Sequence, residues 1–63
     1  MVLPKRQREV AEGIIAGLSS QQIAESLGIA RKTVEAHRYQ LYRSLDVHGI
    51  AQLILAMKRV RKQ

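Results

Sequence analysis

The strongest constraint on the fold lies in residues 23–34, where small and apolar residues surround a single glycine. Ala24 is small enough for a second helix to pass over it, and Gly28 can adopt the left-handed conformation that ends a helix. Four larger apolar side chains would form the core shared by the two helices: Ile23, Leu27, Ile29 and Val34. The spacing predicts two helices crossing at a tight turn. This is the helix-turn-helix arrangement, whose second helix commonly enters a DNA major groove.

Apolar periodicity and end signals predict four helices and no strand, so we expect an all-α fold in which residues 1–63 form one domain. The first helix runs from Pro4, at the first helical position, to about Ala16, and Gly17 stops it. Its inward stripe is expected to comprise Val10, Ala11, Ile14, Ile15 and Leu18. Gly13 weakens this helix by about 1 kcal/mol relative to alanine, but it would permit close helix packing.

The second and fourth helices also carry recognisable signals. Ser19 can cap the second helix while Gln22 reaches back to complete a capping box, and Gly28 ends the helix after about two turns. The fourth helix is predicted over about residues 50–61, after a short connection. Its inward stripe is expected to comprise Ile50, Leu53, Met57 and Val60, with Leu55 largely off the stripe.

The third helix is predicted over about residues 31–45. Its inward stripe contains Val34, Leu41 and Leu45, with His37 or Arg38 filling the gap. Its start lacks a strong cap, because Ala30 stands where serine or threonine is preferred. The outer face of this helix carries Lys32, Glu35, Tyr39 and Arg43.

Charge narrows the choice of partner. The chain has 11 Lys+Arg against 5 Asp+Glu, a net charge of +6, and a pI near 10.6. Such a charge balance favours a polyanionic binding partner, most of all nucleic acid and next an acidic membrane surface. No apolar run approaches the ~18 residues that span a membrane, and the first five residues lack the long apolar stretch of a signal peptide. The absence of cysteine excludes disulfides and thiolate sites and fits a reducing compartment, so we expect a cytoplasmic protein.

The sequence offers little for catalysis or metal binding. It contains no nucleophile–base pair and no glycine-rich phosphate loop, so we expect no enzymatic activity and no cofactor. His37 falls at helical spacing with inward residues and is expected to be a packed histidine. His48 lies eleven residues further on, in a loop, without the carboxylate cluster that a metal site would need.

Three blocks of sequence, in order, carry a resemblance to a known family. Residues 3–10 are similar to an opening of Leu, usually Thr, then Arg-Glu-x-Glu-Val, and residues 17–24 to Gly-Leu-Ser-x-x-Glu/Gln-Ile-Ala. Residues 27–38 match Leu-x-Ile-Ser-x-Lys-Thr-Val-x-x-His, and Leu45-Asp46-Val47 with Leu53 continue the pattern. On these blocks the chain resembles the LuxR-type, or NarL/FixJ-type, DNA-binding domain.

This resemblance implies a four-helix fold whose third helix reads DNA and whose fourth often forms a dimer. Such domains usually follow a receiver or ligand-sensing domain in bacterial transcription regulators. Four positions depart from the family pattern: Gln7 replaces Glu, Gly13 replaces Leu, Ala30 replaces Ser, and Ser44 replaces a frequent Lys. The last change removes a potential phosphate contact.

Eight residues are the candidate DNA contacts, all in the third helix: Arg31, Lys32, Thr33, Glu35, Ala36, Arg38, Tyr39 and Arg43. Lys32 and Thr33 open the helix, where free N–H groups attract phosphate. Glu35, Ala36 and Tyr39 fall where the family's base-facing side chains lie, and glutamate can accept from cytosine while alanine can touch a thymine methyl. The arginines are candidate phosphate clamps. The alternative for Glu35 is a helix-surface partner of Arg31, Lys32 or Tyr39.

The expected partners are double-stranded DNA, a second copy of the chain on that DNA, and RNA polymerase. The candidate dimer contacts lie on the fourth helix: Ala51, Ile54, Leu55 and Lys58. Two other classes of function remain open. One is a protein–protein adaptor, which the acidic Glu35 on the outer face mildly favours. The other is a basic amphipathic membrane binder through residues 50–62, although the core needs the apolar stripe of that segment.

Overall fold

The computed structural model describes residues 3–60, apart from the side chain of Val60. It contains four α-helices and, within these residues, no strand: α1 (Lys5–Ile15), α2 (Ser20–Leu27), α3 (Arg31–Leu45) and α4 (Ile50–Val60). The predicted all-α, four-helix fold is confirmed, and α3 has the predicted bounds. Pro4 is the N-cap of α1 rather than its first helical residue. The predicted end of the fourth helix near Arg61 and the inward side chain of Val60 lie outside the described part.

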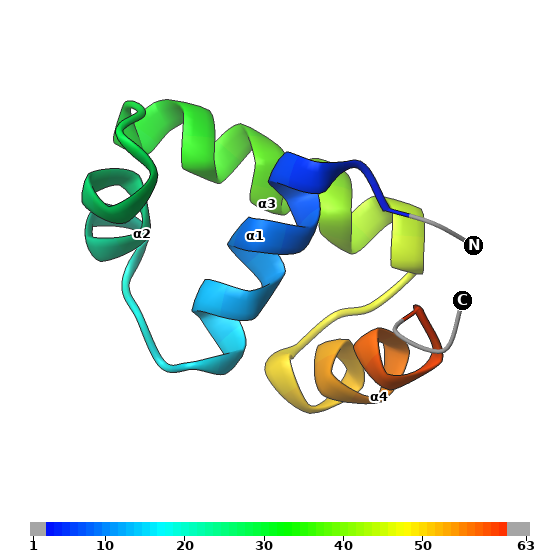
Figure 1. The fold of residues 1–63 in the computed structure, drawn as a ribbon. Coiled ribbons are helices and arrows are strands. Elements are labelled where there is room, and N and C mark those ends of the chain that lie inside the picture. Colours follow the sequence, from blue (N-terminus) through cyan, green and yellow to red (C-terminus); the bar gives the residue numbers. More distant parts are fainter. Residues whose placement is uncertain (1–2, 61–63) are drawn as a thin grey trace.

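The longest helix, α3, organises the others. It runs across the domain, with α1 packed over its middle, α2 near its beginning and α4 on the side of its end (Figure 1). All three other helices contact α3, whereas no Cα pair within 8 Å joins α2 to α4 in the described part. One face of α3 therefore packs against the rest of the fold, and its opposite face is left uncovered.

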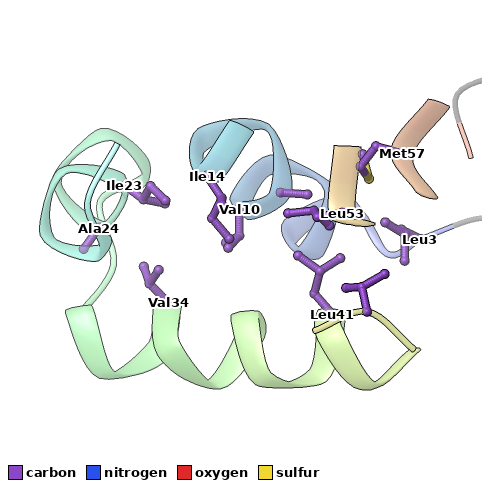
Figure 2. Close-up of a cluster of buried hydrophobic side chains, with 11 residues drawn as sticks. Leu3, Val10, Ile14, Ile23, Ala24, Val34, Leu41, Leu53 and Met57 are labelled. Carbon is purple, nitrogen blue, oxygen red and sulfur yellow. The ribbon is translucent and has the colours of Figure 1, made fainter. Parts of the chain in front are cut away.

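The buried side chains form a single cluster that extends along α3 from near its start to near its end (Figure 2). Near the start of α3, Val34 points toward α1 and α2, and near its end Leu41 points toward Leu53 of α4. The buried apolar residues are Leu3, Val10, Ala11, Ile14, Ile23, Ala24, Val34, Leu41, Val47, Leu53 and Met57. Leu27, Ile29 and Leu45 pack against this cluster while partly exposed.

Three residues expected in the core are instead partly exposed. Ile15 is 38% exposed because it lies about 100° around α1 from Ile14, at the edge of the buried arc. Leu18 is 40% exposed because Gly17, with a φ of 88°, turns the chain away after α1. Ile50 is 50% exposed because the first turn of α4 lies at the edge of the core.

Both ends of α2 have the predicted chemistry. The Ser19 side chain accepts a hydrogen bond from Gln22 N at 3.1 Å, and Gln22 Oε1 accepts one from Ser19 N at 2.9 Å. Gly28 ends α2 with a φ of 69°, in the left-handed region that favours glycine. The helix-turn-helix arrangement is thus stabilised by the capping box at the start of α2 and by a glycine that adopts the left-handed conformation without strain.

Gly13 lies where α1 approaches α2. A Cβ atom at this position would lie 2.7 Å from Ile23 Cγ1 and 3.0 Å from Ile23 Cδ1. These separations are shorter than ordinary carbon contacts of about 3.5–4.0 Å. The expected role of Gly13 in close helix packing is confirmed.

Candidate nucleic-acid interface

The uncovered face of α3 carries a straight row of side chains that we call the outer ridge: Lys32, Ala36, Tyr39 and Arg43. Their spacings of four, three and four residues place them on one helical face, and all four are exposed. Val34 and Leu41, which are fully buried, lie on the opposite face. The outer ridge therefore makes no contribution to the core.

The length of the outer ridge suits a groove of duplex DNA. Lys32 and Arg43 are eleven positions apart, which corresponds to ~16 Å along a helix. The major groove of B-form DNA is ~12 Å wide. A helix crossing such a groove would bring its cationic ends toward the two phosphate backbones and its centre toward the base edges.

Gln40 is an exposed residue beside the outer ridge that was not among the predicted DNA contacts. It follows Ala36 by four positions, so helical spacing alone could have found it. Its amide can both donate and accept hydrogen bonds, the pattern that matches the N6 and N7 edge of adenine. Thr33 is exposed on the same side of the ridge.

Glu35 flanks the outer ridge and pairs with Arg31. Arg31 Nε lies 3.4 Å from Glu35 Oε2, and the two side chains are 65% and 52% exposed. The helix-surface partner considered as the alternative for Glu35 is thus present. An exposed pair at this spacing is worth only ~0.3–0.5 kcal/mol, so a competing DNA group could separate it.

Two arginine–tyrosine pairs follow one another along the second half of α3. Arg43 Nη1 donates to Tyr39 Oη at 3.1 Å, and Arg43 Cζ lies 5.7 Å from the centroid of the Tyr39 ring. Arg38 Cζ lies 5.6 Å from the centroid of the Tyr42 ring. Arg38 and Tyr42 are half-buried, whereas Tyr39 is 62% exposed. Only the Tyr39–Arg43 pair belongs to the outer ridge.

The beginning of α3 is open to an anion. Ala30 provides no side-chain cap, as expected, and its carbonyl accepts from Thr33 N at 3.0 Å and Val34 N at 3.1 Å. The N–H groups of Arg31 and Lys32 have no backbone acceptor in residues 3–60. Unpaired N–H groups and the positive end of the helix dipole favour a phosphate at this position.

The histidines do not form a site. His37 is half-buried on α3, and His48 lies in the α3–α4 connection with Nε2 at 3.9 Å from Asp46 Oδ1. The His48 and Asp46 side chains are 82% and 94% exposed. Across residues 3–60, no three histidine, cysteine, aspartate or glutamate side chains are grouped so as to hold a metal ion.

The candidate dimer contacts lie on α4. Ala51, Leu55 and Lys58 are exposed and share one helical face, whereas Ile54 is half-buried beside it. Leu55 is 60% exposed and borders a shallow hollow that also includes Val47 and Ala56. No helix in the described part is long and apolar enough to cross a membrane.

Comparison with known proteins gives a consistent family match. A family model described as bacterial regulatory proteins of the luxR family matches residues 1–57. No solved structure gave a significant match.

Several curated relatives are similar to this chain. The Fimbriae Z protein of Escherichia coli is 38% identical over 53 residues, covering 84% of this chain and 25% of that protein. The transcriptional regulatory protein FixJ of Bradyrhizobium diazoefficiens is 37% identical over 57 residues, covering 89% and 28% respectively. The transcriptional regulatory protein UhpA of Escherichia coli is 40% identical over 55 residues, covering 87% and 28%. The chain thus corresponds to roughly a quarter of the length of these relatives.

Proposed function

The chain belongs to the luxR family of bacterial regulatory proteins, and on this premise we propose that it binds double-stranded DNA sequence-specifically as the output domain of a transcription regulator. The observation that carries the proposal is the outer ridge of α3, which is exposed along its length and has a cation at each end. In total, α3 carries four basic side chains and one acidic one. The proposed setting is the bacterial cytoplasm, with RNA polymerase as a further partner and with no enzymatic activity.

In the proposed complex, α3 lies in the major groove. Lys32 and Thr33 hold one phosphate backbone from the start of α3, and Arg43 reaches the other backbone from its far end. Ala36 and Tyr39 face base edges at the centre of the ridge, with Gln40 beside them. Arg31 and Arg38, beside the outer ridge, are further phosphate contacts. When Arg31 binds phosphate, Glu35 is released from it and can accept a hydrogen bond from a cytosine amino group.

We also propose that the chain pairs on its DNA through the exposed face of α4. One leucine and its small neighbours bury far less than the ~1,200 Å² of a stable interface, so the free domain is expected to be monomeric. Ala51 permits close approach, while Leu55 supplies the apolar contact and Ile54 and Lys58 form its edge. Two copies joined in this way suit half-sites about one helical turn, ~34 Å, apart.

Lys32→Ala, Glu35→Ala and Tyr39→Ala together test the division between positioning and reading. Lys32→Ala should weaken binding to every duplex alike and lower the slope of affinity against salt by roughly 1. Glu35→Ala and Tyr39→Ala should change base preference instead. The measurement is affinity for a panel of single-base variants of a duplex selected from a random pool, at several salt concentrations.

The outcomes separate the classes of function. Salt-sensitive binding of one duplex in the presence of random competitor supports a sequence-specific DNA-binding domain. A parent protein that binds no duplex under these conditions would refute the proposal and favour a protein adaptor, and binding to anionic vesicles but not to DNA would favour a membrane binder. If Lys32→Ala alters base preference while both other variants leave it unchanged, the assigned roles are wrong.

A further inference from the structure

We propose that Tyr39 has two separable roles at the DNA interface: its ring faces the bases, while its hydroxyl positions Arg43 on the phosphate backbone. The inference rests on the proposed DNA-binding function and adds a positioning role within it. It is carried by the contact between these two residues, which is already present in the protein without DNA.

The geometry of the contact defines what the hydroxyl does. Arg43 Nη1 lies 3.1 Å from Tyr39 Oη, while Arg43 Cζ lies 5.7 Å from the ring centroid. The guanidinium lies over the ring near its hydroxyl end, because Cζ is 5.7 Å from the centroid while Nη1 is hydrogen-bonded to Oη. The hydrogen bond is the contact that removal of the hydroxyl alone would abolish, and Tyr39 is 62% exposed, so its ring stays accessible to bases.

The contact restricts a side chain that would otherwise be mobile. An exposed arginine has many rotamers, and fixing one of them on a phosphate opposes binding through lost conformational entropy. The Tyr39 hydroxyl takes one of the five N–H donors of Arg43 and leaves four for a phosphate. Arg43 is thus held near the end of the outer ridge before DNA arrives.

Tyr42 provides a matched control on the same helix. Its ring lies 5.6 Å from Arg38 Cζ, a distance similar to that in the Tyr39–Arg43 pair. However, within the described part of the chain the Tyr42 hydroxyl makes no hydrogen bond to a side chain. Removing the Tyr42 hydroxyl therefore tests the loss of a tyrosine oxygen without the loss of a positioned arginine.

The experiment compares Tyr39→Phe, Arg43→Ala, the double variant and Tyr42→Phe with the parent, using a selected duplex and its single-base variants. Tyr39→Phe keeps the ring, so affinity should fall about two- to tenfold on every duplex with base preference unchanged. Arg43→Ala should lower the salt slope by roughly 1. In the Arg43→Ala background, Tyr39→Phe should have no further effect. Tyr42→Phe should bind like the parent, and circular dichroism should show all four variants folded.

Three results would overturn the positioning role. The first is an equal loss from Tyr39→Phe with and without Arg43→Ala, which would show that the hydroxyl acts independently of Arg43. The second is a changed base preference in Tyr39→Phe, which would make the hydroxyl a base contact. The third is parental affinity in Tyr39→Phe. All three presuppose a parent that prefers one duplex in a salt-dependent manner, and absence of that preference would instead refute the proposed function.

Discussion

Gly13→Ala should destabilise the fold even though alanine is the better helix former. The new Cβ would lie 2.7 Å from Ile23 Cγ1, an atom close to the backbone of a side chain that is 2% exposed. Ile23 cannot withdraw without disturbing its own packing. The approach of α1 to α2, rather than the local preference of the helix, should therefore decide the sign of the effect.

The magnitude follows from two opposing terms. Replacing glycine by alanine inside a helix gains about 1 kcal/mol, whereas overpacking a core typically costs about 1–3 kcal/mol. The free energy of unfolding of Gly13→Ala should therefore be about 0–2 kcal/mol lower than that of the parent. Ile23→Ala removes both crowding atoms at a cost of about 2–5 kcal/mol, and in that background Gly13→Ala should instead stabilise by about 1 kcal/mol. The coupling between the two sites should therefore be about 1–3 kcal/mol.

Urea unfolding followed by helical circular dichroism measures these free energies, with the slope of each transition checking that the variants unfold alike. Ile23→Val serves as a milder background if Ile23→Ala is too unstable, since it removes Cδ1 but leaves Cγ1 in place. Gly13→Ala should then be less harmful than in the parent. An identical effect of Gly13→Ala in all backgrounds, or a gain of about 1 kcal/mol in the parent, would refute the packing argument.

Three further predictions concern the turn, the start of α3 and the exposed face of α4. Gly28→Val should destabilise by about 1–3 kcal/mol through backbone strain alone, because φ is 69° and the position has open space around it; an unchanged denaturant midpoint would contradict this. Ala30→Ser should stabilise by about 0.5–2 kcal/mol by supplying the missing cap, and a lower midpoint would count against it. Leu55→Glu should leave circular dichroism unchanged but abolish cooperative binding to two half-sites while sparing a single half-site. Retained cooperativity would place the dimer contact elsewhere.

Local signals predicted much of the fold because they act over a few residues. The capping box of Ser19 and Gln22 and the left-handed Gly28 depend on neighbouring backbone groups, so their pattern is visible in the sequence. Burial at the ends of elements depends instead on which distant segment covers them. Leu3 and Val47 are buried although neither lies in a helix, and no periodicity marks them.

One backbone feature also escaped prediction. Asp46 adopts a φ of 53° at the end of α3, where glycine or asparagine would be the usual signal. Aspartate tolerates this conformation less readily than glycine, so its identity alone does not reveal the turn.

For the candidate interface, the sequence predicted which side of α3 is exposed. The outer face was predicted to carry Lys32, Glu35, Tyr39 and Arg43, and all four side chains are exposed. The contact between Tyr39 and Arg43 was not predicted, because each residue was assigned a role singly. Which rotamers bring two long side chains together is decided by the surrounding surface and not by spacing alone.

The division of α3 into a buried face and an uncovered face has a consequence for how such a domain can acquire a new operator. The residues proposed to face the bases, Ala36, Tyr39 and Gln40, are exposed, so exchanging several of them at once should leave the melting temperature almost unchanged. Recognition and folding can then vary independently within a single helix. A library randomised at positions 36, 39 and 40 should accordingly yield folded proteins at high frequency, whereas one randomised at positions 34 and 41 should not.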